Sequence, residues 1–461
     1  MISNRMSRTL SLTTDPIPQL IWRIAVPSSV GLFFNTMYNF VDTYCAGLLS
    51  TDALAALSLS FPVFFVIVAV GSGLGQGATA LLANALGAGQ NAEARHIFAQ
   101  SIVLVAGTGI VLSFAGWQLT PWLFSQLGAR GEYLHAALAY MNMILMGGVF
   151  FLLPMTINAA LTAQGNTRVY RNFLIVGFVA NCVLNPVLMW GWLGLPALGV
   201  AGIALATVVI QIGGSVWLWR QVTRSGLCAA LPLELFRPDI SILRRIVAQA
   251  LPAALNMLTI ALGIFVITRF VQQFGREAVA AIGIATRIEQ VVLMPVIGLS
   301  SAVLSIVGQN HGAGLPQRVR EAWTTCIRYG VMLMIGGGAI VWLLRERAMR
   351  YFTADPAIIA DGSSYLSAAA VTLAAYPILF GTVFLMQGLK RPAYGLWIGL
   401  YRQVLAPLIV IHTLIFVYGW GLLGIWWGVC MVNWSAALFA FWWGRLTVRA
   451  QFDVQAIGQS A

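Results

Sequence analysis

The stretch Ala25-Val26-Pro27 recurs as Ala250-Leu251-Pro252, and Gly87-Ala88-Gly89 recurs as Gly312-Ala313-Gly314. Both pairs are separated by the same interval along the chain, so the match runs without a gap across two apolar segments. A repeat of this size divides the chain into two related halves. The residues that break the symmetry between the halves are therefore the first candidates for function.

The composition places this chain in a membrane. Of its 461 residues, 59% are hydrophobic and only 9% are charged, whereas soluble domains carry about 25% charged residues. We expect about twelve apolar segments, each long enough to cross the bilayer as a helix. They lie near 19–47, 54–87, 94–120, 133–163, 169–192, 197–221, 242–272, 277–311, 317–343, 358–388, 393–417 and 421–445. Six spans per half make the halves parallel repeats, an arrangement common in secondary transporters. The predicted fold is an all-α polytopic membrane protein of two pseudo-symmetric six-helix bundles.

The basic residues that give the net charge of +12 are distributed as in a membrane protein and do not indicate a nucleic-acid site. Most Lys and Arg residues fall in alternate connections and in the termini, which places both termini in the cytoplasm of a multi-pass inner-membrane protein. Five lie on the opposite side, namely Arg130, Arg276, Arg345, Arg347 and Arg350, and three lie inside apolar segments, namely Arg269, Arg287 and Arg402. We expect no nucleic-acid partner.

The longest polar interruption lies between the sixth and seventh segments, where a link between two halves belongs. The predicted organisation is an N-terminal tail at 1–18, an N-terminal lobe at 19–221, a linker at 222–241, a C-terminal lobe at 242–445 and a C-terminal tail at 446–461. We expect both tails and the linker to be cytoplasmic. One chain contains both halves, so a monomer suffices.

Only two of the fourteen acidic residues, Asp42 and Glu289, lie well inside apolar segments. An ionised carboxylate there costs several kcal/mol, so it is usually functional or paired. The counterpart of Asp42 in the second half, at the interval of the repeat, is Ile267, so this acid belongs to the N-terminal half alone. Pro27 lies fifteen residues earlier on the same predicted helix and must weaken or kink it.

Two amide side chains join Asp42 in the candidate site. Asn181 and Asn185 are four residues apart, so both share one helix face. The hydroxyl of Thr207 on the next segment is able to join them. With Asp42, these residues would form a polar pocket that carries one negative charge. The alternative is that the two amides only form structural hydrogen bonds to neighbouring helices.

The chain resembles the multidrug and toxic compound extrusion (MATE) transporters, of the DinF-like branch. The residues that carry the resemblance are Pro27, Asp42, Asn158, Gln164, Gly165, Asn181, Gly199 to Thr207, Arg287-Ile288-Glu289-Gln290, Pro295 and Gly308 to Ala313. The resemblance implies a V-shaped pair of six-helix bundles around a central cleft. It also implies export of amphipathic, often cationic compounds by alternating access.

By the same resemblance, the acid of the first helix binds the coupling H⁺ or Na⁺, and its ionisation accompanies bending at the proline. These residues would be Asp42 and Pro27, and the cation pocket would comprise Asp42, Asn181, Asn185 and Thr207. The branch usually has aspartate where this chain has Asn185. Loss of one of two carboxylates weakens a cation site. We therefore favour H⁺ coupling through Asp42 and keep Na⁺ coupling at this pocket as the alternative.

The remaining predictions concern substrate and the second acid. Asn35, Tyr38, Met155 and Asn158 are candidate substrate contacts near the pocket. Glu289 is a possible second functional acid, although an ion pair with Arg269 or Arg402 is the plainer interpretation. A lipid-linked oligosaccharide flippase of the wider superfamily remains an alternative function. No nucleophile, metal cluster or acid–base pair has catalytic spacing, so we expect neither an enzyme nor a cofactor.

Overall fold

The computed structural model describes residues 11–227 and 231–460, with the backbone alone for 453–460. The predicted tails and linker therefore lie partly outside the described residues. All regular elements of the described chain are helices, which confirms the predicted fold class. The α-helices are α1 (Ile17–Leu49), α2 (Thr51–Gly87), α3 (Asn91–Gln126), α4 (Gly131–Met146), α5 (Gly148–Ala163), α6 (Arg168–Trp190), α7 (Val200–Arg224), α8 (Ile240–Val271), α9 (Arg276–Gly312), α10 (Pro316–Phe352), α11 (Pro356–Thr372), α12 (Tyr376–Gly388), α13 (Ala393–Leu400), α14 (Ala406–His412) and α15 (Gly421–Ser460).

Short turns of other helix types join some of these elements. The 3₁₀ turns are η2 (Trp192–Gly194), η3 (Leu233–Phe236), η4 (Gln272–Phe274) and η5 (Leu373–Ala375). Two π-helical turns, η6 (Tyr401–Leu405) and η7 (Thr413–Val417), flank α14. The apolar segments predicted at 358–388 and 393–417 are therefore each one span assembled from several helical pieces.

Within the described residues, eleven helical runs are long and apolar enough to cross a membrane, and a bent pair brings the number to twelve. The bent pair is α4 and α5, which meet at 47° where one continuous segment was predicted at 133–163. Gly147 and Gly148 lie at the bend, and each approaches a neighbouring helix closely. A Cβ atom on Gly147 would lie 2.6 Å from the side chain of Val208 on α7. Adjacent small residues are a common cause of such sharp kinks.

The described chain forms two compact units. The N unit contains Val30–Leu86 and Gln90–Ala254, and the C unit contains Gly87–Gly89, Leu255–Ala461 and the described residues up to Ser29. These units differ from the predicted lobes in two helices, because α1 and α8 each belong partly to both units. The first half of α1 lies in the C unit, and the first half of α8 lies in the N unit.

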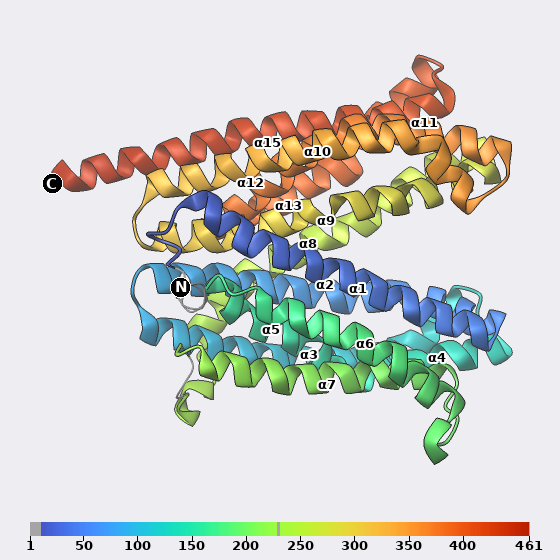
Figure 1. Ribbon diagram of the computed structural model, residues 1–461, viewed down its shortest axis with the longest axis horizontal. Coiled ribbons are helices and arrows are strands. Elements are labelled where there is room, and N and C mark those ends of the chain that lie inside the picture. Colours follow the sequence, from blue (N-terminus) through green and yellow to red (C-terminus); the bar gives the residue numbers. More distant parts are fainter. Residues whose placement is uncertain (1–10, 228–230, 461) are drawn as a thin grey trace, which may run out of the picture. The chain divides into compact units, whose positions relative to one another are not determined.

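The core of the N unit lies among α3 to α7. The pairs α3–α5, α6–α7, α4–α7 and α5–α7 pack against each other (Figure 1). Phe98, Phe124 and Met141 are fully buried there. Burial of such large apolar side chains contributes about 1.5–3 kcal/mol each.

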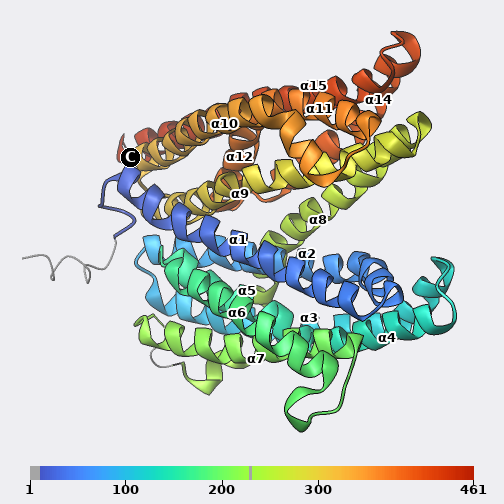
Figure 2. The ribbon, with the colours of Figure 1, turned by 45° about the vertical axis from the view of Figure 1, so that its right-hand side comes forward.

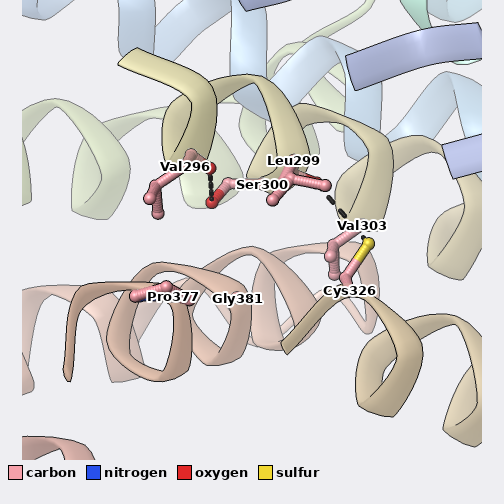
Figure 3. A pocket seen from close by; sticks show the side chains of 7 residues that line it. All are labelled: Val296, Leu299, Ser300, Val303, Cys326, Pro377 and Gly381. Carbon is pink, nitrogen blue, oxygen red and sulfur yellow. Dashed lines mark hydrogen bonds between the residues drawn. The ribbon is translucent and has the colours of Figure 1, made fainter. Parts of the chain in front are cut away.

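In the C unit, α9 packs against α10, α11 and α12, and α12 packs against α15 (Figure 2). Its largest fully buried side chains are Trp323 and Trp426. Between α9, α10 and α12 lies a cavity of ≈ 10 Å³, lined by Val296, Leu299, Ser300, Val303, Cys326, Pro377 and Gly381 (Figure 3). This volume admits about one water molecule at most, so the helices here are closely packed.

Candidate functional site

Asp42 lies in the second half of α1, within the N unit, with only 7% of its surface exposed. Nδ2 of Asn181 and Nδ2 of Asn185 each donate a hydrogen bond of 2.8 Å to its Oδ1. Both asparagines are fully buried on α6. Their separation of four residues presents both amides to the same carboxylate oxygen.

The two amides also bond to each other. Nδ2 of Asn181 lies 3.4 Å from Oδ1 of Asn185, and Nδ2 of Asn185 lies 3.3 Å from Oδ1 of Asn181. The amide oxygens thus face the neighbouring amide, and the amide N–H groups face Asp42. This arrangement supplies hydrogen-bond donors, the groups that a carboxylate oxygen needs when it is removed from water.

Close packing of α1 on α6 brings the acid to the amides. A Cβ atom on Gly31 would lie 3.1 Å from the side chain of Leu174 and 3.3 Å from the backbone of Arg171. Phe34 contacts Phe178 one turn further along, with ring centroids 5.5 Å apart. A larger residue at position 31 would separate the helices and lengthen the bonds to Asp42.

Two hydroxyl groups complete the polar cluster. Thr207 on α7 donates to the carbonyl oxygen of Ile203 at 3.2 Å, and its side chain also lies beside the Asp42 carboxylate. The hydroxyl of Tyr38 lies beside Asn181 and Thr207, yet it is buried and makes no well-formed hydrogen bond to any residue that the structure describes. Tyr38, predicted as a substrate contact, therefore belongs to the group around Asp42.

Two neighbours of this cluster were missed by sequence reasoning. The phenol of Tyr140 on α4 is buried near Asp42, and the thiol of Cys45 lies beside Asn185. Cys45 follows Asp42 by three residues, and that helical spacing was a usable signal. No local pattern pointed to Tyr140, because it lies on a helix distant in sequence.

Asp42 has no ionic partner in the described part of the chain, where no Lys, Arg or His nitrogen lies within 4.0 Å of its carboxylate. The amides carry no net charge and cannot neutralise it. A buried carboxylate without a cation costs several kcal/mol when ionised. Binding of a proton or a metal cation would remove this unpaired charge.

The other predicted substrate contacts do not hydrogen-bond to Asp42. Asn35 is exposed on α1, and its carbonyl oxygen accepts a bond from Asn39. Met155 on α5 packs against α2, since its Sδ lies 2.8 Å from a Cβ built on Gly71. Oδ1 of Asn158 is buried without a hydrogen-bond partner in the described residues. These three residues share the N unit with the acid but remain predictions as substrate contacts.

The second embedded acid, Glu289, lies in the C unit and is 7% exposed. The hydroxyl of Tyr365 donates to it at 2.6 Å, and the hydroxyl of Tyr376 donates at 2.9 Å. The ion pair expected with Arg269 or Arg402 is not formed, as no arginine nitrogen of the described residues lies within 4.0 Å.

Arg402 is nevertheless close to this group. Its guanidinium lies 5.9 Å from the ring centroid of Tyr376 and 5.8 Å from that of Phe380, and its Nη1 donates to Asn433 at 3.0 Å. The tyrosines, which lie on α11 and α12, occupy the positions nearest to Glu289.

Comparison with known proteins identifies the fold and the family. A family model described as MatE matches residues 27–187 and again residues 252–411. The chain is 26% identical to a solved multidrug resistance MATE family transporter of the MOP superfamily, described as outward-facing. That match covers 97% of this chain and 99% of the other, with a TM-score of 0.90.

Two curated bacterial relatives extend the likeness. An FAD transporter of Shewanella oneidensis is 28% identical over 86% of this chain and 88% of its own length. A probable multidrug resistance protein, NorM of Thermotoga maritima, is 28% identical over 76% of this chain and 75% of its own. The chain therefore belongs to the MatE family, the multidrug and toxic compound extrusion (MATE) transporters, whose members are transporters and not enzymes.

Proposed function

We propose that this protein exports amphipathic or cationic compounds in exchange for protons, with Asp42 as the coupling residue. The observation that carries the proposal is a buried carboxylate held by two neutral amides with no cation beside it in the described residues. Such a group has two states of different charge, and the protein must rearrange around whichever state is present. That difference links proton movement to a conformational change.

Pro27 is the proposed bending point. It lies on α1 two residues before the point where α1 passes from the C unit to the N unit. Proline cannot donate the helical hydrogen bond to the carbonyl four residues earlier, so the helix is weakest here. Protonation of Asp42 would then change how the second half of α1 is held against α6, with the bend absorbed at Pro27.

The amide arrangement favours H⁺ over Na⁺ as the coupling ion. A sodium ion requires several oxygen ligands, and both amide N–H groups at this site point toward Asp42 instead. Sodium binding would require both amides of Asn181 and Asn185 to turn over. A proton requires no such change. The chain would belong to the DinF-like branch, with Asn185 as its departure from the usual acid. Na⁺ coupling at Asp42, Asn181, Asn185 and Thr207 stays the alternative.

Glu289 has a structural role in this proposal. Its two tyrosine bonds join α9 to α11 and α12 within the C unit. The side of the membrane follows from the arginine distribution, which favours the inner membrane with cytoplasmic termini. The protein would act as a monomer in the lipid bilayer.

A flavin nucleotide is the second candidate substrate. The relative from Shewanella oneidensis is named an FAD transporter, and the match covers most of both chains. Arg402 supports this candidate, because it is a guanidinium inside a membrane span with no acidic partner within 4.0 Å in the described residues. An anionic substrate would favour such a group.

Efflux from proteoliposomes tests the proposal. Vesicles loaded with ethidium, and separately with FAD, are given a pH gradient with and without Na⁺. The expected result is ethidium efflux that follows the pH gradient and is lost in Asp42→Asn. Asp52→Asn is the matched control, because Asp52 is an exposed acid of the same unit.

Each other outcome contradicts a defined part of the proposal. Efflux that requires Na⁺ would refute proton coupling, and FAD efflux alone would refute the cationic substrate. Asp42→Asn with wild-type efflux would remove Asp42 from the coupling mechanism. Absence of efflux under every gradient would favour a lipid-linked oligosaccharide flippase.

A further inference from the structure

Two helices, α1 and α8, pass from one compact unit to the other near the middle of their length, whereas α2 reaches the C unit only with its last residue, Gly87. α1 passes from one unit to the other between Ser29 and Val30, and α8 does so between Ala254 and Leu255. The two crossing points are separated by the same interval as the repeat in the sequence. Each crossing lies two residues beyond a proline, Pro27 in α1 and Pro252 in α8.

The first half of each helix is held by a glycine at equivalent positions. In the N unit, a Cβ atom on Gly73 of α2 would lie 2.7 Å from the carbonyl oxygen of Ala250 and 2.6 Å from the Cβ of Ala254. In the C unit, a Cβ on Gly298 of α9 would lie 2.6 Å from the carbonyl oxygen of Ala25. The two glycines are separated by the interval of the repeat, as are the two alanines. The same backbone-to-backbone contact is therefore built twice.

The segment before α8 is also held in place. Gln100 on α3 is fully buried, and its Nε2 donates to the carbonyl oxygens of Leu235 and Arg237 at 2.7 Å each. Its Oε1 accepts from the backbone N–H of Asp239 at 2.9 Å. One side chain thus makes three hydrogen bonds to the chain that leads into α8.

The segment before α1 is held in the C unit by a similar device. Arg318 on α10 donates to the carbonyl oxygen of Asp15 at 2.6 Å and to Oδ1 of Asn310 at 2.9 Å. Asn310 in turn donates to the carbonyl oxygen of Leu12 at 2.9 Å. The start of each crossing helix is therefore fixed to one unit.

The second half of each helix belongs to the other unit. In α1 that half carries Asp42 and packs on α6 through Gly31. In α8 it packs on α13, where a Cβ on Gly395 would lie 3.8 Å from Nδ2 of Asn256. The residue of α8 that corresponds to Asp42 is Ile267, so this helix has no acid of its own. Any bending of α8 must follow a change made elsewhere.

A helix whose two ends are held by different units bends most easily at a proline between them. Pro252 has no backbone N–H, so the carbonyl of Ala248 loses its helical partner, and the ring crowds that carbonyl. Hinges are a few positions that absorb the backbone change while the packed segments on either side move as rigid bodies. In this structure α8 is continuous through Pro252, as α1 is through Pro27.

We propose that Pro252 is a second hinge, a positioning residue at which α8 bends whenever the units rearrange during transport. The inference rests on the proposed transport function, but it concerns a helix without a coupling acid. A rigid α8 would tie the N unit to the C unit and oppose the change that begins at Asp42. Both crossing helices must then bend in one cycle.

Three variants separate a hinge from a packing residue. Pro252→Ala restores the helical hydrogen bond and stiffens α8, whereas Pro252→Gly keeps the helix pliable while removing the ring. Pro62→Ala is the matched control, because Pro62 lies inside α2 in the N unit and in neither crossing helix. We expect Pro252→Ala to lower the maximal efflux rate about tenfold, with ethidium affinity unchanged and Pro252→Gly close to wild type.

Spin-label distances provide a readout that does not need transport. One label is placed at Gln126, exposed in the N unit, and one at Ala354, exposed in the C unit, in a cysteine-free background. Pro252→Ala should narrow or shift the distance distribution, and Pro252→Gly and Pro62→Ala should leave it as in the wild type.

The outcomes distinguish this inference from the proposed function. Wild-type distances and rates in Pro252→Ala would overturn the hinge. Equal losses of rate in the Ala and Gly variants would also overturn it, because they indicate a packing role for the ring. Failure of the wild type to export ethidium would contradict the proposed function alone, and the distance measurement would still decide the hinge.

Discussion

Nδ2 of Asn185 on α6 donates a hydrogen bond of 2.8 Å to Oδ1 of Asp42 on α1. With the amide of Asn181, it surrounds one carboxylate with hydrogen-bond donors. In the proposed mechanism, the choice of coupling ion depends on this contact.

Asn185→Asp is expected to convert the site toward sodium. Two carboxylates at hydrogen-bond distance repel each other unless a cation or a shared proton lies between them. We expect Na⁺ affinity, measured by calorimetry on purified protein, to rise at least about tenfold. Asn158→Asp is the control, because Asn158 is an amide of the same unit that does not bond to Asp42. Unchanged Na⁺ binding would show that Asn185 does not decide ion choice.

Tyr38→Phe tests the Tyr38 hydroxyl in transport with little effect on the stability of the fold. The hydroxyl of Tyr38 is buried and forms no hydrogen bond within the described part of the chain, so its removal costs little folding energy. We expect the thermal midpoint to stay within about 2 °C of wild type, because the substitution breaks no hydrogen bond to a described residue. Efflux should fall if this hydroxyl bonds to substrate or to Asp42 in another state. A fall of many degrees would show that the hydroxyl is already satisfied.

Gly298→Ala should destabilise the C unit. The added Cβ would lie 2.6 Å from the carbonyl oxygen of Ala25 and would also clash with the hydroxyl of Ser29. Overpacking of this kind costs about 1–3 kcal/mol, measurable as a lower thermal midpoint. Gly336→Ala is the control, because nothing lies within 4 Å of a Cβ at that helical position. Equal midpoints for the two variants would contradict the close approach of α1 to α9.

Glu289→Ala tests the structural role of the second acid. The variant leaves the hydroxyls of Tyr365 and Tyr376 buried without their acceptor, at about 1–3 kcal/mol each. Glu289→Gln keeps a carbonyl oxygen in place and should cost less. Glu277→Ala, at an exposed acid of the same helix, is the control. Both Glu289 variants should retain proton-driven efflux per folded molecule, and its loss in Glu289→Gln would assign this acid to transport.

Much of the fold could be predicted because its signals are local. Apolar segments of sufficient length predict membrane helices, and the eleven or twelve apolar spans of the described residues confirm them. The bend at Gly147 and Gly148 was not predicted, since glycine occurs throughout these helices and the close approaches of these two to Val208 and Ser113 appear only in the folded protein. The interruptions by π turns in the span 393–417 have no sequence pattern of their own.

The candidate site divides in the same way. Asp42 was identifiable because an acid in an apolar segment is costly, and the amides of Asn181 and Asn185 because four residues make one helical turn. The pairing of Glu289 with Tyr365 and Tyr376 was not, and an arginine was expected instead. Polar groups from three other spans could reach this buried acid, and only the distances in the folded protein show which of them bond to it.

The sequence by itself determined that this protein is a helical membrane protein of two related halves with one asymmetric acid, because length, hydropathy and repetition are properties of the chain alone. The tertiary structure decided which groups meet that acid and where the compact units divide. Those properties depend on how closely helices distant in sequence approach, and that approach is set by packing at a few small residues such as Gly31, Gly73 and Gly298.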